Sequence, residues 1–302
     1  MKKPTIGNFL YNWRVAPYVF VLPFILAFAI FWVYPLFSAF QMSFQNIRPG
    51  QIQWAGFANY QRLFKDPTFF LAVGNSFLYM VLTILLLIPF PLLFAVLLDS
   101  KLVKAKGVYK AMLYMPALSS IVVTGIMFRL AFSEMDMSVA NQVIGFFGNP
   151  PVKWFAQKGT AFFVLLLLCC WRWTGVNMIY FISGLKGIDP GLYESAEIDG
   201  ANWMQKFFYI TIPMLKPTII YVLTISIYAG LAMFMEVFML MGNGGPKDIA
   251  LTIVGYLYRR GIERGTSELG YASAIGVVLM LIALAINITQ LKLTGTLKQR
   301  KD

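Results

Sequence analysis

Three acidic side chains stand close together between two long apolar segments of the chain. Glu194, Glu197 and Asp199 lie within a few residues of one another and are followed directly by Gly200. Carboxylates in this setting accept hydrogen bonds and pair with basic side chains. Exposed acids contribute little to membrane topology, which depends on Lys and Arg. The cluster is therefore free to bind a partner, and solvated acids on an ordinary amphipathic surface helix are the alternative.

The sequence offers little for catalysis or metal binding. It contains no His, and its two cysteines, Cys169 and Cys170, are adjacent within an apolar segment. Such a pair indicates small buried side chains rather than a disulfide or a metal site. The G-x-x-x-x-G-K-[ST] pattern of a P-loop is absent. We therefore expect no catalytic residue, no bound metal and no cofactor on this chain, so that any ATP and Mg would bind another subunit.

Composition places these residues in a membrane protein. The 302 residues are 59% hydrophobic and only 13% charged, with a mean hydropathy of +0.68, whereas soluble domains carry roughly 25% charged residues. The apolar residues form segments near or above the roughly 20 residues that a helix needs to cross a bilayer. We predict an all-α integral membrane protein with six transmembrane helices, at residues 15–44, 69–98, 111–132, 161–184, 217–241 and 271–291.

The basic residues predict the orientation of these spans. Lys and Arg are retained on the cytoplasmic side in short loops, and the inner segments carry more of them when both termini are placed inside. Residues 1–14 and 292–302 are then cytoplasmic, 15–291 form one transmembrane domain, and 185–216 form a cytoplasmic loop. Topology and anionic lipid headgroups explain the net charge of +12, so no nucleic-acid partner is expected.

The loop 185–216 has the local pattern of two short helices. Asp189 followed by Pro190 is typical of a helix start, and Gly200 is typical of a helix end. Asn202 and Gln205 are spaced as a capping box for a second helix. That helix is predicted to end at Pro213 and to carry one apolar face, formed by Trp203, Met204, Phe207 and Phe208.

The same loop resembles the signature of permease subunits of binding-protein-dependent ABC importers. The family pattern E-A-A-x-x-x-G-x(9)-I-x-L-P is similar to Glu194-Ser195-Ala196, Gly200 and Ile210-Thr211-Ile212-Pro213. Ser195 and Ile212 depart from the pattern, each by a small change of shape. The resemblance covers nearly the whole chain and implies a type I ABC importer fold with a cytoplasmic coupling helix.

Further motifs resemble the sugar-transporting branch of that family: Asp199 to Ala201, Gly56 to Tyr60, Asn243 to Pro246, and Gly270 to Ala274. The implied function is the permease subunit of an ATP-driven importer that translocates a sugar or oligosaccharide by alternating access. A non-sugar solute, such as an amino acid or a polyol phosphate, is the alternative within the family. A secondary transporter would need its own coupling-ion site and usually an internal inverted repeat, and neither is visible.

The resemblance also implies that this chain is not an enzyme, because ATP hydrolysis belongs to a partner. The implied partners are a second homologous permease subunit, two cytoplasmic ATPase subunits, an extracellular solute-binding protein, the sugar and the lipid of the cell (inner) membrane. Glu194 would pair with a basic residue of the ATPase, and Gly200 would make the tight turn. The implied coupling residues are Glu194, Ser195, Ala196, Glu197, Asp199, Gly200, Ala201, Ile210 and Pro213.

Polar and aromatic residues within the fourth and fifth predicted spans are candidates for the substrate path. Ionisable residues inside a span are costly and suggest function by default. Planar polar groups hydrogen-bond sugar hydroxyls, and aromatic faces stack on the apolar side of the ring. The candidates are Trp171, Arg172, Trp173, Asn177, Phe234 and Glu236. The alternatives are a structural ion pair between Arg172 and Glu236, or a tryptophan belt without substrate contact.

Overall fold

The computed structural model describes residues 13–48, 50–100, 103–263 and 268–295. Most of the two expected cytoplasmic termini, residues 1–12 and 296–302, lies outside this description. The chain divides into two compact units. The first contains the residues up to Lys65 and Arg260–Val278, and the second contains Asp66–Arg259 and the residues from Leu279 onward.

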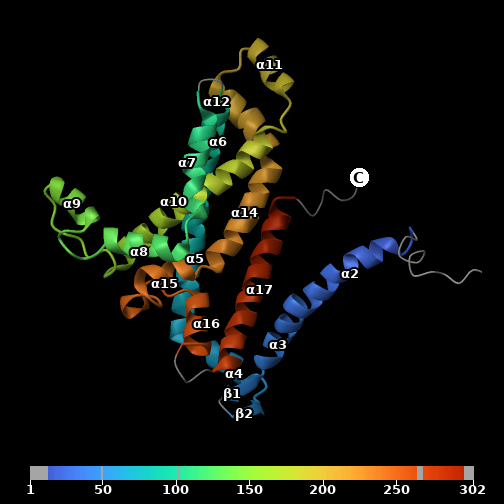
Figure 1. The fold of residues 1–302 in the computed structure, drawn as a ribbon, viewed down its shortest axis with the longest axis vertical. Helices are drawn as coiled ribbons and strands as arrows, with labels where there is room; N and C mark the ends of the chain where they lie inside the picture. Colours follow the sequence, from blue (N-terminus) through green and yellow to red (C-terminus); the bar gives the residue numbers. More distant parts are fainter. Residues whose placement is uncertain (1–12, 49, 101–102, 264–267, 296–302) are drawn as a thin grey trace, which may run out of the picture. The chain divides into compact units, whose positions relative to one another are not determined.

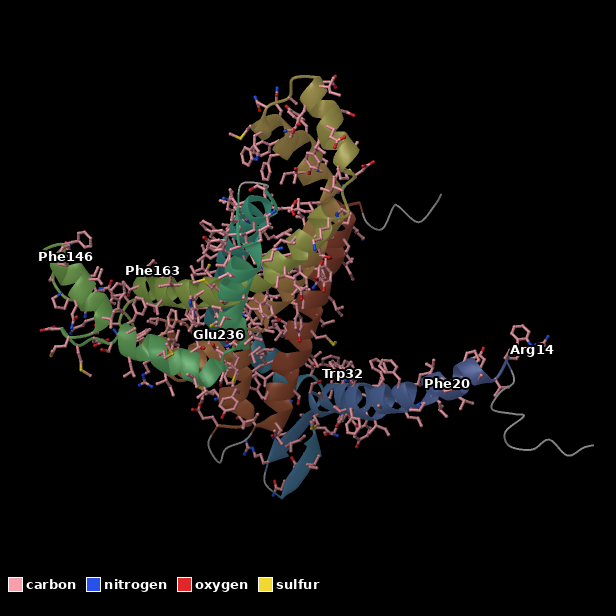
Figure 2. The ribbon with its side chains drawn as sticks, turned by 45° about the horizontal axis from the view of Figure 1, so that its top comes forward. Arg14, Phe20, Trp32, Phe146, Phe163 and Glu236 are labelled. Carbon is pink, nitrogen blue, oxygen red and sulfur yellow. The ribbon has the colours of Figure 1, made fainter. Side chains whose placement is uncertain are left out.

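The first unit begins with a long apolar helical run. It consists of α2 (Ala16–Phe28), a π turn (Ala29–Val33) and α3 (Tyr34–Met42), close to the predicted span 15–44. None of these residues is buried, and the side chains of Phe20 and Trp32 extend freely from the helix (Figure 2). A helix that is apolar on all sides belongs in lipid or against another helix.

A small hairpin and a short helix follow this run. Strands β1 (Gln45–Arg48) and β2 (Gln51–Trp54) pair antiparallel, with Gln45 opposite Trp54. The hairpin was not predicted from the sequence, and the short helix α4 (Ala58–Leu63) follows it. Asn59 Nδ2 donates to the carbonyls of Ser43 and Gln45 at 2.9 and 3.0 Å, which ties α4 to the hairpin.

The first unit also contains an ionic cluster, formed by Arg62, Arg260 and Glu268. Glu268 accepts from Arg62 at 2.8 Å and from Arg260, the next-to-last residue of α16 (Ile253–Gly261), at 2.7 Å. Both guanidinium groups lie over the ring of Tyr271, at 4.3 and 5.1 Å from its centroid. Tyr271 is in the first turn of α17 (Leu269–Leu293), the helix predicted at 271–291.

In the second unit α10 (Lys158–Leu185) packs against α5 (Pro67–Leu87), α6 (Pro89–Asp99) and α7 (Lys106–Leu118), and α14 (Lys216–Leu231) packs along α5. Figure 1 shows these helices bundled, with α11 (Pro190–Ile198) and α12 (Trp203–Lys206) at one end of the bundle. Gly175 lets α10 approach α7 closely, because a Cβ there would lie 1.9 Å from the Leu113 carbonyl oxygen. Small residues permit such close helix packing in membranes.

Two predicted spans are broken, which corrects the sequence-based boundaries. The span predicted at 111–132 is α7 and α8 (Ile121–Ala131), which meet at 94°. Pro116 lies near the end of α7, and Ser119 and Ser120 are extended, which removes helical hydrogen bonds at this point. The span predicted at 217–241 ends at Leu231, and α15 (Met235–Met241) then packs against α8. Residues 232–234 between the two helices are not helical.

The described residues contain four helices long and apolar enough to cross a membrane, or up to six if each bent pair is one span. The second bent pair joins Trp203–Met214 to α14 at 67°. The unit is completed by α9 (Val139–Phe146) and by a 3-10 turn (Pro246–Asp248) before α16. The fold is thus predominantly helical, as predicted.

Candidate functional site

The first half of the loop 185–216 is a capped helix, as its sequence predicts. Asp189 Oδ1 accepts from the backbone N–H of Gly191 at 2.9 Å, and Pro190 occupies the first turn of α11. Gly200 has φ +78°, and the N–H of Ala201 donates back to the Ala196 carbonyl at 2.8 Å. A left-handed glycine with such a bond is a common helix stop. The helix α11 contains no buried residue.

The second half of the loop begins with the predicted capping box. Asn202 accepts from the Gln205 N–H at 2.9 Å, and the Gln205 side chain accepts from the Asn202 N–H at 2.7 Å. The helical backbone continues through a π turn (Phe207–Thr211) and α13 (Ile212–Met214), so it ends one residue beyond the predicted end at Pro213. Pro213 falls in the first turn after the π turn, where its missing N–H costs little.

Only part of the apolar face predicted on this second helix packs against the rest of the unit. Phe207 packs on the core of the second unit with Ile210 and Ile212, and its ring stacks on Trp203 at 5.5 Å. Trp203, Met204 and Phe208 are more than half exposed. A bond of 2.9 Å between Tyr193 Oη and Thr211 Oγ1 joins α11 to the π turn.

The acids of the loop differ in their surroundings. Glu197 Oε1 lies 2.5 Å from Lys206 Nζ, so this acid is paired within the loop. Glu194 and Asp199 are exposed, and no hydrogen bond or ion pair is found for their side chains within the described residues. Glu194 therefore lies on α11 as a solvent-facing carboxylate, as expected from the sequence.

A hollow of about 340 Å³ lies between α11 and the second helix. Five of the implied coupling residues line it: Ala196, Asp199, Gly200, Ala201 and Ile210. The other four, Glu194, Ser195, Glu197 and Pro213, do not line it, and Gln205, Lys206 and Tyr209 complete its wall. The structure thus brings most of the motif to one concave surface and leaves Glu194 outside it.

A cavity of about 150 Å³ lies among α5, α10, α14 and α15. We call it the polar cavity because one acid, one amide and several hydroxyl residues interrupt its apolar lining. Three predicted substrate-path residues line it: Trp173, Asn177 and Glu236. Figure 2 labels Glu236 among the packed side chains of this unit. Tyr79, Thr83 and Ser226 add hydroxyl groups that sequence analysis missed. Isolated hydroxyl residues in apolar spans carry no sequence signal that separates a cavity lining from ordinary helix packing.

Asn177 has a structural partner that the prolines of α6 create. In a continuous helix the carbonyl of Leu87 would accept from the backbone N–H of residue 91, but that residue is Pro91. Asn177 Nδ2 donates to the Leu87 carbonyl at 2.9 Å instead. Membrane helices tolerate proline where a neighbouring side chain satisfies the freed carbonyl in this way.

Arg172 lies apart from the cavity and from Glu236. Its guanidinium lies 5.5 Å from the ring centroid of Trp173, and its Nε and Nη1 atoms are buried without a hydrogen-bond partner in the described part of the chain. The four ion pairs found there do not include one between Arg172 and Glu236. The structural ion pair considered as an alternative is therefore not formed.

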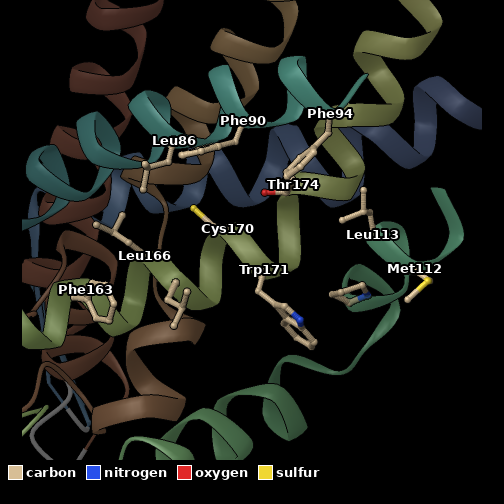
Figure 3. A pocket seen from close by; sticks show the side chains of 12 residues that line it. Leu86, Phe90, Phe94, Met112, Leu113, Phe163, Leu166, Cys170, Trp171 and Thr174 are labelled. Atoms are coloured by element: carbon tan, nitrogen blue, oxygen red, sulfur yellow. The ribbon is translucent and has the colours of Figure 1, made fainter. Parts of the chain in front are cut away.

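The other two path candidates occupy different surroundings. Trp171 lines an apolar pocket of about 680 Å³ between α10, α6 and α7, together with Phe90 and Phe94 (Figure 3). Phe234 packs against Phe238 and Tyr258, with ring centroids 5.3 and 5.0 Å apart. The six candidates thus separate, and only three of them share one cavity.

Comparison with known proteins matches this geometry to one family. Residues 68–293 match the family described as "Binding-protein-dependent transport system inner membrane component". The arabinooligosaccharides transport system permease protein AraP of Bacillus subtilis is 46% identical over 291 residues, covering 96% of this chain and 92% of that protein. The lactose transport system permease protein LacF of Rhizobium radiobacter is 32% identical, covering 90% and 92%.

A solved structure agrees with these relatives. The crystal structure of a bacterial ABC transporter involved in the import of the acidic polysaccharide alginate contains a chain of similar fold, with a TM-score of 0.80, 26% sequence identity, and coverage of 95% of this chain and 96% of that one. A second crystal structure of the alginate transporter, in complex with an alginate pentasaccharide-bound periplasmic protein, gives a TM-score of 0.81. The chain therefore belongs to the family of inner membrane components of binding-protein-dependent transport systems, as an ABC importer permease.

Proposed function

We propose that this permease carries a sugar or oligosaccharide across the cell membrane after an extracellular solute-binding protein delivers it. The observation that carries the proposal is similarity along nearly the whole chain to two arabinooligosaccharide permeases, each 46% identical over 96% or more of this chain. An arabinose-containing oligosaccharide is accordingly the first substrate to test.

The polar cavity is the proposed substrate path. Trp173 offers an aromatic face, and Asn177, Glu236 and the hydroxyls of Tyr79 and Ser226 offer hydrogen-bonding groups within apolar helices. An aromatic face and several polar groups suit a ring that is apolar on one side and hydroxylated at its edge. Trp171, Phe234 and Arg172 have no direct part in this path, since they do not line the cavity.

The loop 185–216 is the proposed coupling element. The sequence lacks a P-loop, so ATP and Mg would bind to two separate ATPase subunits, and this chain is not itself an ATPase. The exposed carboxylate of Glu194 on α11 would meet a basic side chain of one ATPase subunit. Helix α11 is capped at its ends and is bonded to the rest of the loop through Glu197 with Lys206 and through Tyr193 with Thr211. These contacts support a rigid coupling element that transmits motion as one body.

The assembly would place two permease subunits side by side in the membrane with both termini of this chain in the cytoplasm. A homologous second permease would cover apolar surface that is exposed here, including α2 and α3, and lipid would cover the rest. Closure of the ATPase pair would then rock the permeases between inward-open and outward-open states.

The test is uptake by the reconstituted transporter. Proteoliposomes containing this chain, the second permease and the ATPase subunits should accumulate labelled arabino-oligosaccharide only when ATP and the binding protein are both present. Accumulation of an amino acid but of no saccharide under the same conditions would contradict the proposed substrate class.

A further inference from the structure

Glu236 gives the polar cavity its one formal charge, beside neutral groups that can donate or accept hydrogen bonds. Of its twelve lining residues, Glu236 is the one acid, and neither Lys nor Arg is among them. Trp173, Asn177 and three hydroxyl residues supply the other polar groups that face the cavity. What these groups can still donate or accept follows from the bonds that they already make.

Two of the neutral groups have already used donor hydrogens. The single hydroxyl hydrogen of Thr83 is directed at the carbonyls of Tyr79 and Met80, each 2.9 Å from Oγ1, so this hydroxyl is left with acceptor capacity. Asn177 donates an amide hydrogen to the Leu87 carbonyl, and its Oδ1 is an acceptor. With the two carboxylate oxygens of Glu236, these atoms give the cavity several acceptors for the hydroxyl groups of a saccharide.

Arg172, on α10, is not among the residues that line the cavity, whereas Glu236, on α15, is. The guanidinium of Arg172 lies over the Trp173 ring, outside the lining of the cavity, and makes no ion pair with Glu236 in the described chain. The carboxylate therefore acts on the cavity without a lining countercharge. In a low-dielectric interior, like charges a few ångströms apart repel strongly.

We propose that Glu236 makes this cavity a filter against anionic solutes: it admits neutral hydroxyl-rich saccharides and rejects those that carry a carboxylate, sulfate or phosphate group. The inference rests on the proposed function, because it assumes that the cavity is the substrate path. It adds the charge class of the substrate and the side chain that selects it. A saccharide hydroxyl donates to the acceptors of the cavity, whereas an anionic group meets the like charge of the Glu236 carboxylate.

Cys169 provides a probe that does not depend on the binding protein. Its side chain lines the same cavity, whereas Cys170 lines the apolar pocket and is removed by Cys170→Ala. The assembled transporter is treated with methanethiosulfonate reagents of similar size carrying an ammonium, a hydroxyl or a sulfonate group, in the presence and absence of ATP. Mass spectrometry of the Cys169 peptide gives each rate, normalised to the rate with free cysteine.

The expected result is a preference for the cationic over the anionic reagent that falls by about 10- to 100-fold in Glu236→Gln. Glu236→Asp keeps the charge and should keep most of the preference, which controls for a change in packing. An unchanged preference in Glu236→Gln would overturn the filter, and so would absence of Cys169 labelling in every nucleotide state, since solutes would then not reach the cavity. Uptake of neutral oligosaccharide by the unmodified transporter, measured separately, reports on the proposed function alone.

Discussion

Lys206 Nζ lies 2.5 Å from Glu197 Oε1 and thereby joins the two helices of the loop 185–216. This ion pair separates Glu197 from the two neighbouring acids, Glu194 and Asp199. Glu197 is used within the chain, whereas Glu194 and Asp199 are exposed and have no ion pair in the described part of the chain. Of the exposed pair, Glu194 lies within α11, and Asp199 lines the hollow between α11 and the second helix.

Replacing Lys206 by Met should weaken coupling more than it weakens folding. The pair is partly exposed, with 19% of the Lys206 side chain and 63% of the Glu197 side chain accessible, and such pairs contribute about 0–1 kcal/mol to stability. We expect a melting temperature within a few degrees of wild type, but fewer substrate molecules transported per ATP hydrolysed. Lys216→Met, at an exposed lysine at the start of α14, is the matched control, and equal coupling ratios in the two variants would refute the role of the pair.

Glu194→Lys should separate the permease from its ATPase. The substitution places a positive charge where a basic partner residue is expected, and reversal of an interfacial charge pair commonly costs a factor of ten or more in affinity. The variant should reach the membrane at normal levels and lose co-purification with the ATPase subunit. Glu134→Lys makes the same change at an exposed acid outside the loop and should leave co-purification intact. Normal association and transport by Glu194→Lys would remove the docking role from this residue.

Asn177→Leu should destabilise the bundle through the carbonyl of Leu87. Loss of the 2.9 Å bond leaves a buried acceptor unpaired in an apolar interior, which costs about 1–3 kcal/mol. The melting temperature in detergent should fall by several degrees.

A double substitution tests this cause directly. Pro91→Ala restores the backbone N–H that the Leu87 carbonyl lacks, so Asn177→Leu should be less damaging in the Pro91→Ala background than in wild type. Additive effects of the two substitutions would show that the carbonyl is not the shared partner.

Trp173→Ala should raise the oligosaccharide concentration needed for half-maximal uptake, whereas Trp171→Ala should not. Trp173 lines the polar cavity and Trp171 lines the apolar pocket on another side of α10. Loss of an aromatic contact worth about 0.5–1.5 kcal/mol predicts a change of roughly 2- to 10-fold. The measurement is ATP-driven uptake in proteoliposomes across a range of binding-protein-bound substrate. Equal effects of the two variants would argue that neither ring meets the substrate.

The sequence by itself determined the features that depend on a few neighbouring residues. The start of α11 at Asp189, its stop at Gly200 and the capping box of Asn202 with Gln205 all formed where predicted. Each consists of hydrogen bonds between residues at most five positions apart, so no distant partner is needed to specify it. Apolar segment lengths likewise located the long helices α5, α10 and α17.

Only the tertiary structure decided which side chains meet. Asn177 donates to the carbonyl of a residue ninety positions earlier in the chain. Helix α8, which meets α7 at 94°, packs against α15 from a distant part of the sequence. Three adjacent residues of α10 show this: Trp171 lines the apolar pocket, and Trp173 lines the polar cavity. Arg172, between them, lines neither. Successive side chains on a helix differ in direction by about 100°. The rotation of α10 about its axis therefore decides which cavity each side chain reaches. Packing between segments that are distant in the sequence sets that rotation.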